Sequence, residues 1–304
     1  MTIGIPRGML YYRYQIIFQQ YFGALGAKTL LSEPTTQGLA EAGAAATIDE
    51  ACLALKLYMG HVQSLLGKCD WILIPRVCGY GHFRDMCPRF HSLYDMTVNI
   101  FRGSGQKFLS FNVDVRHGIS EEDAFTTLGE TLGYGKKAAR KAYLQAKKED
   151  QRRWKQRIAA QNAQFERDGL KILIAAHSYV VEDAYIGKPI LDFLKKNGAV
   201  PIRADIVDRE TARKRSGELS PTCKWEMSRE ILGGIQTYRD KVDGIILLST
   251  FPCGPDAMVD ELLLRRLSGI PMLNLVLDGQ NGTAGMETRL ESYLDIIRFK
   301  KGEL

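Results

Sequence analysis

The residues of this sequence that could take part in the widest range of reactions and ligand bonds are its cysteines. They are Cys52, Cys69, Cys78, Cys87, Cys223 and Cys253. No two of them form the Cys-x-x-Cys pair that is typical of zinc ribbons, thioredoxin-type dithiols and compact ferredoxins. The N-terminus has no signal-peptide pattern, so we expect a cytoplasmic protein in which disulfides are a poor explanation for the thiols. Buried inert thiols and ligands of a metal or cluster remain as alternatives.

Cys253 has the most informative surroundings, because it lies between a predicted strand and a predicted helix. Residues 242–250 form an apolar run typical of a buried strand, and the sequence Gly254-Pro255-Asp256 marks a helix N-terminus with proline at the first helical position. Helix-end amides and the helix dipole favour a thiolate, or a thiolate-bound cluster, at such a place. Whether Cys253 acts alone depends on which elements bring other thiols to the same region.

The elements that position the cysteines alternate between strands and helices along the whole chain. Strands are predicted near residues 3–6, 28–31, 71–75, 108–113, 170–176, 200–206, 242–250 and 271–278, with helical segments between them. This alternation predicts an α/β protein with two doubly wound, mostly parallel-sheet domains. The expected boundaries are an N-terminal domain over residues 1–135, a linking helix over residues 136–168 and a C-terminal domain over residues 169–304.

In such domains the loops after the strands and the N-termini of the helices share one edge of the sheet, where ligands bind. Five cysteines are predicted at this edge: Cys52, Cys78, Cys87, Cys223 and Cys253. Cys69 falls between a helix C-terminus and a strand start, hence on the opposite edge, and we expect it to be a structural thiol. The sequence thus directs attention to the crevice between the two domains.

The positions of the first-half cysteines depend on local predictions. Residues 47–50, Thr-Ile-Asp-Glu, match a capping box that would start a helix and place Cys52 in its first turns. Residues 76–95 are predicted as a loop-rich stretch that contains Cys78 and Cys87, and a loop of that length usually has a function. A polar, alanine-rich segment extends up to Ala46, and residues 208–222 are predicted as an irregular polar connection.

Thiolates contributed by separate loops suit an iron–sulfur cluster. Such clusters need soft anionic ligands, and an open position at iron admits substrate or water. Buried or merely reactive cysteines are the alternative interpretation of the same spacing.

The charge pattern argues against a nucleic-acid or membrane partner. The net charge of +6 is concentrated in residues 136–157, where ten Lys or Arg face two acidic residues. No aromatic-interleaved basic patch accompanies them, so we expect a solvated helix or a docking face for an acidic protein.

No apolar run approaches the ~20 residues of a membrane span. No Gly-x-x-x-x-Gly-Lys phosphate loop occurs, so the chain is not expected to hydrolyse ATP.

Nine short phrases carry a resemblance that spans nearly the whole chain. They are Ile3-Gly-Ile-Pro-Arg7, Leu10-Tyr-Tyr12, Asp49-Glu-Ala-Cys-Leu-Ala-Leu-Lys56, Gly60-His-Val62, Ile74-Pro-Arg76, Cys87-Pro-Arg-Phe90, Phe251-Pro-Cys-Gly-Pro-Asp256, Asn274-Leu-Val-Leu-Asp278 and Gly285-Met-Glu-Thr-Arg289. These phrases resemble the family of acyl-CoA dehydratase activase-related proteins. That family is similar to the iron–sulfur subunits of 2-hydroxyacyl-CoA dehydratases and to double-cubane cluster proteins.

The resemblance implies a cluster held by Cys52, Cys87 and Cys253, and a separate iron–sulfur activator ATPase that drives one electron into the chain at low potential. A homologous partner subunit or a homodimer is also implied. In the dehydratases the electron enters a thioester carbonyl, and the resulting ketyl radical expels the neighbouring hydroxyl. We expect a single [4Fe–4S] cluster rather than a double cubane [8Fe–9S], which normally takes six cysteine ligands. Cys78 or Cys223 could supply an extra ligand.

His177 and Tyr179 follow a predicted strand and face the same crevice. They are candidates for proton donation or for supporting the cluster ligands. The alternative is that the histidine only caps a helix. If the chain is an enzyme, we expect a 2-hydroxyacyl-CoA dehydratase-like lyase or a component of an ATP-dependent low-potential reductase. The alternatives are a non-catalytic electron relay, a cluster- or ligand-binding module of a larger dehydratase-like complex, and a two-domain small-molecule sensor with structural cysteines.

Overall fold

The structure, a computed structural model, describes residues 1–279 and 284–302. Within these residues it contains two four-stranded sheets whose strand pairs are parallel, which confirms the predicted α/β class with two domains. The chain divides into two compact units. Unit 1 comprises Met1–Lys155 and Lys224–Glu226, and unit 2 comprises Gln156–Cys223 and Met227–Leu304. The first division therefore falls within the long helix α7 (Lys136–Asn162).

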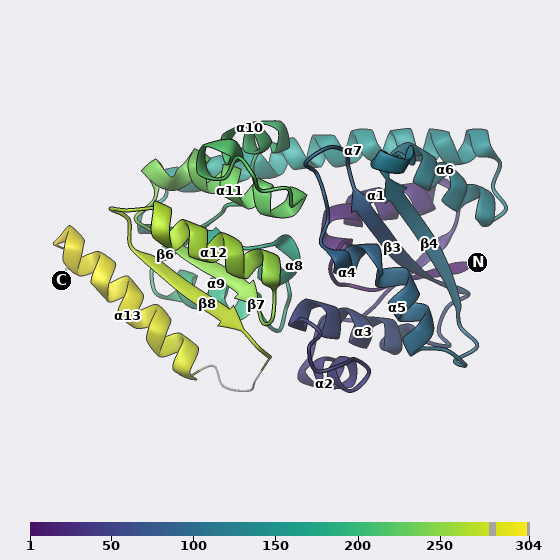
Figure 1. Cartoon of the computed structure of the whole chain (residues 1–304), viewed down its shortest axis with the longest axis horizontal. Helices are drawn as coiled ribbons and strands as arrows, with labels where there is room; N and C mark the ends of the chain where they lie inside the picture. The colour runs from purple at the N-terminus through teal and green to yellow at the C-terminus, as the bar shows by residue number, and fades with distance from the viewer. Residues whose placement is uncertain (280–283, 303–304) are drawn as a thin grey trace. The chain divides into compact units, whose positions relative to one another are not determined.

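Unit 1 is built on a parallel sheet with the strand order β2-β1-β3-β4, in which β3 and β4 lie side by side (Figure 1). Its strands are β1 (Thr2–Ile5), β2 (Lys28–Leu31), β3 (Trp71–Gly79) and β4 (Lys107–Asp114). Its helical segments are α1 (Tyr11–Ala24), α2 (Gln37–Ala45), α3 (Leu53–Leu65), α4 (Pro88–His91), α5 (Leu93–Ile100), the 3-10 turn Val115–His117, α6 (Glu121–Thr131) and the first part of α7.

Aromatic side chains form the core between this sheet and the helices α1, α6 and α7. Phe125 of α6 lies 4.5 Å from the Phe111 ring of β4, 5.0 Å from Tyr143 of α7 and 6.1 Å from Phe18 of α1, measured between ring centroids. Phe125 is fully buried, and truncation of such a ring costs about 3–5 kcal/mol. These contacts fix α1, α6 and α7 on one face of the sheet.

The helix α2 lies in the polar, alanine-rich segment before Ala46. It packs so closely against α3 that a Cβ atom at Gly43 would lie 1.9 Å from the Lys56 carbonyl oxygen, and one at Gly60 would lie 2.2 Å from the Leu39 carbonyl oxygen. This tertiary contact between small residues stabilises the helix, and the local sequence does not show it.

The prediction of a capping box at residues 47–50 is wrong. The Thr47 hydroxyl donates to the Gly43 carbonyl at 3.0 Å, so this threonine closes α2 instead of starting the next helix. The helix α3 begins at Leu53, and Cys52 is its N-cap residue rather than a residue of its first turns.

The stretch of residues 76–95 is more regular than predicted. Because β4 continues to Asp114 and offers pairing partners as far as Gly79, β3 runs past Pro75 and contains Cys78. The helices α4 and α5 occupy the end of the stretch. The loop proper is therefore limited to residues 80–87, and Cys87 is its last residue.

Unit 2 repeats the architecture with the strand order β6-β5-β7-β8. Its strands are β5 (Leu170–Ala175), β6 (Ala199–Arg203), β7 (Gly244–Thr250) and β8 (Met272–Leu277). Its helical segments are the 3-10 turns Ala163–Glu166 and Arg239–Lys241, α8 (Ser178–Val181), α9 (Lys188–Lys196), α10 (Arg209–Leu219), α11 (Glu226–Tyr238), α12 (Gly254–Arg266) and α13 (Ala284–Lys301). The predicted start of the last helix, Thr283, lies outside the described residues.

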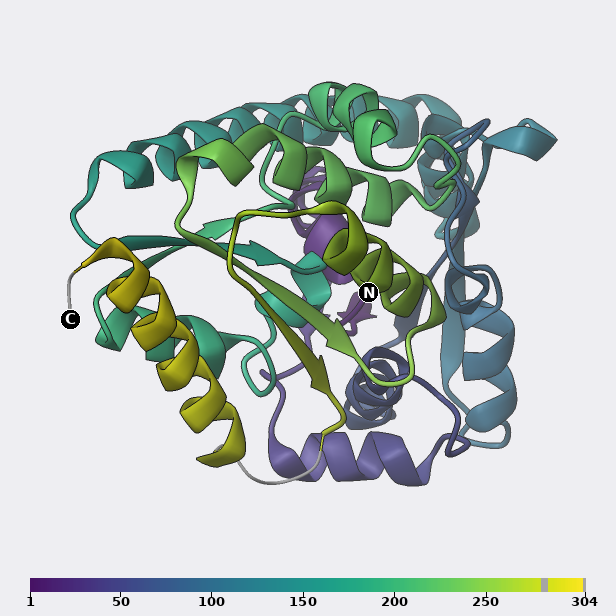
Figure 2. The ribbon, with the colours of Figure 1, turned by 60° about the vertical axis from the view of Figure 1, so that its left-hand side comes forward.

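The helices α10, α11 and α12 share one hydrophobic core with this sheet, and α13 lies on the other face (Figure 2). The Tyr293 hydroxyl of α13 donates to the Ile245 carbonyl of β7 at 3.0 Å. The helix α10 occupies the segment predicted as an irregular connection. Asp208 caps it by accepting from the Thr211 amide at 2.8 Å, but its sparse apolar residues give almost no periodic signal.

No helix in residues 1–279 and 284–302 has both the length and the apolar character needed to cross a membrane.

Candidate functional site

Three of the cysteines occupy equivalent positions in the secondary structure. Cys52, Cys87 and Cys253 are the N-cap residues of α3, α4 and α12, each partly exposed and each with an extended backbone. In parallel α/β units these helix starts lie at the edge of the sheet where the strands end. All six cysteines lie outside disulfides.

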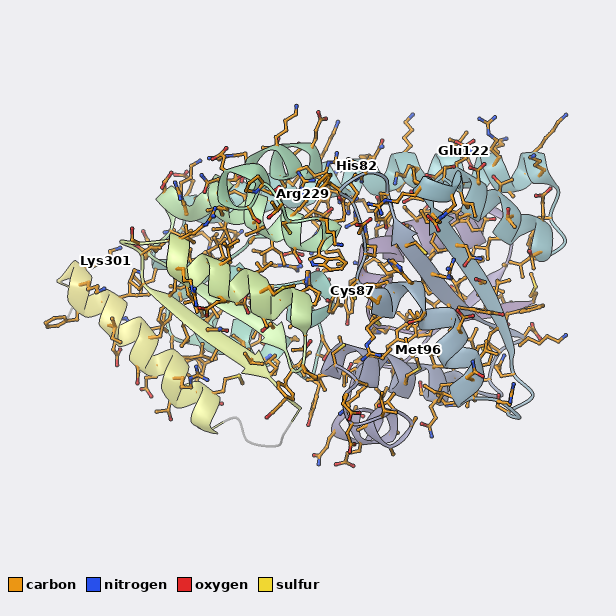
Figure 3. All side chains as sticks on the ribbon, in the orientation of Figure 1. His82, Cys87, Met96, Glu122, Arg229 and Lys301 are labelled. Atoms are coloured by element: carbon orange, nitrogen blue, oxygen red, sulfur yellow. The ribbon has the colours of Figure 1, made fainter. Side chains whose placement is uncertain are left out.

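The segments that carry Cys52 and Cys87 lie side by side within unit 1. The Arg89 guanidinium, two residues after Cys87, donates to the carbonyl of Glu50, two residues before Cys52, at 3.5 Å. Cys87 lies where the loop after β3 meets α4 (Figure 3). Unit 1 therefore brings two of the predicted ligands to one edge of its sheet.

The loop that leads to Cys87 is anchored by a segment distant in sequence. The Arg84 guanidinium donates to both carboxylate oxygens of the fully buried Glu226, at 2.7 and 3.1 Å. The Asp85 amide donates to the Lys224 carbonyl at 2.9 Å, and the Glu226 amide donates to the Asp85 carbonyl at 2.8 Å. The sequence analysis missed this anchor, because nothing in the spacing of Arg84 and Glu226 indicates that they meet.

The other three cysteines lie in packed positions. The Cys78 thiol in β3 donates to the Asp114 carboxylate, and burial is the main cause that raises its pKa. Cys223 packs against the hydrophobic core of unit 2. The Cys69 thiol is directed to the Leu65 carbonyl at 3.7 Å and lies so close to Gly4 that a Cβ atom there would be 2.5 Å away.

In unit 2, Cys253 belongs to a hydrogen-bonded group of buried side chains. It follows β7 and a cis Phe251–Pro252 bond, and α12 starts at the next residue, one position earlier than predicted. The Cys253 thiol donates to the Asp256 carboxylate. The Oδ1 atom of the same carboxylate lies 2.8 Å from Nε2 of His177, the N-cap residue of α8 directly after β5.

The pair formed by His177 and Asp256 is buried, with 5% and 6% of the two residues exposed. Burial lowers the pKa of His177, but the charge and hydrogen bond of Asp256, and the charges of Asp205 and Glu230, raise it above its ordinary value. Burial raises the pKa of Asp256, but His177 and the Cys253 thiol lower it below its ordinary value. These opposite shifts favour an imidazolium paired with a carboxylate beside the cysteine.

A second carboxyl group, Asp260, lies one helical turn beyond Asp256 and is 7% exposed. Burial and the charge of Asp256 raise its pKa to about 7, although a hydrogen bond with Ser249 acts to lower it. Its Oδ2 atom is buried without a hydrogen-bond partner in the described part of the chain. The sequence analysis missed Asp260, although its four-residue spacing from Asp256 on a helix was a usable signal.

Tyr179 stacks on His177, with ring centroids 5.0 Å apart and an interplanar angle of 20°. Because both side chains are almost completely buried, they pack behind the cysteine turn instead of lining an open surface. The arrangement suits a role in holding Asp256 and Cys253 in place.

No three His, Cys, Asp or Glu side chains of residues 1–279 and 284–302 are grouped so that they could hold a metal ion. The donor chemistry of the three N-cap thiols nevertheless suits an iron–sulfur cluster, since thiolate sulfur is its usual ligand.

Comparison with known proteins gives one informative match. A family model described as the CoA enzyme activase uncharacterised domain (DUF2229) matches residues 2–207, which is more than half of the chain. This range contains Cys52, Cys87 and His177 but not Cys253. No curated protein matches the sequence. Among solved structures, the crystal structure of ZnuA aligns over 98% of this chain and 97% of its own, with 10% identity and a TM-score of 0.27, a similarity too low to carry an argument.

Proposed function

The chain belongs to the family of the CoA enzyme activase uncharacterised domain, and from this premise we propose that it is an iron–sulfur protein of a dehydratase-related system. In this proposal it receives low-potential electrons from an ATP-dependent iron–sulfur activator in the cytoplasm. The electrons serve a reductive or radical dehydration of a small substrate, with an acyl-CoA thioester as the first candidate.

The observation that carries the proposal is the cysteine turn of unit 2. Cys253 starts α12 at the edge where β7 ends, and its thiol is held by the buried pair of Asp256 and His177. A thiol that merely filled space would need no charged pair behind it, because an inert cysteine behaves as a small apolar side chain. A ligand must be held in place, and the hydrogen bond to Asp256 orients the protonated thiol before it releases its proton to bind iron.

We propose that Cys52, Cys87 and Cys253 supply thiolate ligands to a [4Fe–4S] cluster. When bound, the cluster would supply one-electron transfer at low potential. The amides at the starts of α3 and α12 would favour the negative charge of the thiolates that precede them. The helix α4 after Cys87 has only four residues, so we assign it no such effect.

His177 and Tyr179 are proposed as positioning residues. Their burial leaves them no access to a substrate in this conformation, whereas His177 directly holds Asp256 and Tyr179 packs on His177. This burial favours the non-catalytic relay as the second candidate function, in which the chain passes electrons to a partner that carries out the chemistry.

Anaerobic reconstitution with iron and sulfide tests the cluster. We expect a coloured protein with about four iron and four sulfide per chain. The Cys253→Ser variant should lose most of that iron, whereas the matched Cys69→Ser variant should keep it. A colourless wild-type protein, or equal iron in the wild type and Cys253→Ser, would contradict the proposal.

Anaerobic turnover separates the two candidate functions. The reconstituted chain is mixed with an ATP-dependent iron–sulfur activator and with 2-hydroxyacyl-CoA thioesters. Dehydrated product shows that the chain is catalytic. Reduction of its cluster without product supports the relay, and absence of reduction contradicts the proposed electron source.

A further inference from the structure

Unit 2 contains a cavity of about 500 Å³ that none of the cysteines lines. It lies along the outer edge of β6, which is the edge strand of its sheet, between the last part of α7 and the helix α9. A volume of this size falls in the range of small-molecule sites. The cavity is therefore a candidate binding site that is separate from the cysteine turn.

The strand edge at the floor of this cavity is closed to an added peptide strand. The Gln161 side chain takes the place of a neighbouring strand at Arg203: its Nε2 donates to the Arg203 carbonyl at 2.9 Å, and its Oε1 accepts from the Arg203 amide at 2.9 Å. Two residues earlier, Pro201 has no amide hydrogen to offer. A small molecule therefore fits the cavity better than an extended peptide.

The charges around the cavity favour an anion. Four cationic side chains line it against the single carboxylate of Asp168; they are Arg157, Arg167, Lys195 and Arg203. Both Arg157 and Arg203 contact Glu182 Oε1, at 2.5 and 2.6 Å, and Arg203 also binds Asp205. When the three carboxylates of Asp168, Glu182 and Asp205 are counted against the four cations, an excess of one positive charge remains.

The two exposed cations are the ones suited to a ligand. Arg167 donates to the neutral Gln164 side chain at 2.9 Å, so that contact leaves its charge uncompensated. Lys195 lies in the last turn of α9. Arginine and lysine side chains of this kind bind phosphate oxygens through charge-assisted hydrogen bonds.

Part of the remaining wall is apolar. Leu191, Val200 and Pro201 line the cavity beside these cations. An apolar wall next to a cationic rim matches a molecule with one flat or apolar part and one anionic group. Inorganic phosphate alone would leave the apolar wall uncovered.

We propose that this cavity binds an organic phosphate of about the size of a nucleoside monophosphate, with the phosphate at Arg167 and Lys195 and the organic part on Leu191 and Pro201. The site is independent of the cysteines, so the proposal stands apart from the iron–sulfur function.

Isothermal titration of the full chain at low salt with AMP, adenosine and inorganic phosphate tests the site. We expect AMP to bind more tightly than either fragment. Arg167→Gln and Lys195→Gln should each weaken AMP binding about 5–10-fold, since each removes one charge-assisted contact. Lys196→Gln is the matched control, because Lys196 is an exposed neighbour on α9 that does not line the cavity, and it should leave AMP binding unchanged.

Ala160→Phe tests the volume of the cavity without touching a cation. Ala160 lines the cavity from an exposed position of α7, so circular dichroism should show a folded protein while AMP binding is lost. Three results would overturn the proposal: no AMP binding at millimolar concentration, adenosine or phosphate binding as tightly as AMP, and equal weakening by Lys196→Gln.

Discussion

Each unit buries one histidine, and the surroundings shift the pKa of the two rings in opposite directions. His61 of α3 is 0% exposed and lies between the hydroxyls of Ser32, at 2.9 Å, and Thr35, at 3.0 Å. Burial and the nearby charge of Arg7 lower the pKa of His61 to about 3, so the ring is neutral. His177 of unit 2 is buried almost as deeply, but its carboxylate neighbours raise its pKa.

The comparison shows that burial alone does not decide the chemistry of a side chain. Neutral hydroxyls and a cation surround His61, which makes it a packing residue of α3. Carboxylates near His177 raise its pKa, which favours the cationic form of the ring beside a cysteine. A protein keeps such a charge buried only where neighbours compensate it, and in unit 2 the compensating Asp256 also holds the Cys253 thiol.

Removal of His177 should have the largest effect on stability. His177→Ala leaves the Asp256 carboxylate buried without its cation, which costs about 3–5 kcal/mol. Hydrogen exchange of the β5 and β7 amides measures the loss within unit 2, since the tryptophans Trp71, Trp154 and Trp225 all belong to unit 1. The matched His61→Ala variant should destabilise unit 1 by about 1–3 kcal/mol, because it leaves hydroxyls rather than a charge unpaired. Equal losses in the two units would break the comparison.

Asp260→Asn should stabilise unit 2 at pH 8. The folded protein keeps the Asp260 proton up to about pH 7, whereas the unfolded chain releases it near its ordinary pKa of 3.8. Stability therefore falls as pH rises from about 4 to 7, by up to about 4 kcal/mol. The neutral amide avoids that loss, so we expect a gain of about 2–4 kcal/mol at pH 8 and little change at pH 4, measured by the same hydrogen exchange.

The control for Asp260→Asn is Glu261→Gln at the next position of α12, where the side chain is exposed. A gain of the same size from Glu261→Gln would show that general charge reduction, rather than the buried carboxyl, is responsible.

The lowered pKa of His61 should make unit 1 sensitive to acid. Its stabilising contribution is complete above the unfolded pKa of 6.5 and is lost as pH falls toward the folded value of about 3. We expect a loss of about 1.4 kcal/mol for each pH unit below 6.5, hence about 2 kcal/mol at pH 5. Tryptophan fluorescence during urea unfolding reports this loss for unit 1. His61→Asn should lack this part of the acid dependence, and an unchanged slope in that variant would contradict the assignment.

Arg84→Lys should have the smallest effect. Lysine cannot reproduce the two-point contact with Glu226, so we expect a loss of about 1–2 kcal/mol and faster proteolysis of the loop before Cys87. Arg116→Lys is the control, because Arg116 is half exposed and binds Asp85 on the same loop. Equal effects of the two substitutions would contradict a special role of the buried contact between Arg84 and Glu226.

The sequence predicted the strands and helices that position the site better than the side-chain contacts within it. Apolar runs followed by helix signals indicated that β7 ends before Cys253 and that β5 ends before His177. The parallel topology then placed both residues at one sheet edge. The contact between His177 and Asp256 was not predictable, because it depends on β5 and β7 being neighbours in the sheet order. The anchor of Arg84 on Glu226 joins residues 142 positions apart, and no local pattern carries such information.

The central claim is that the N-cap cysteines hold an iron–sulfur cluster. The most direct test is the EPR spectrum of the anaerobically reconstituted and chemically reduced protein. We predict the spectrum of one reduced [4Fe–4S] cluster per chain, which Cys253→Ser removes or changes and Cys69→Ser preserves. A reduced protein without any iron–sulfur signal, or one whose signal is identical in Cys253→Ser, would contradict the account.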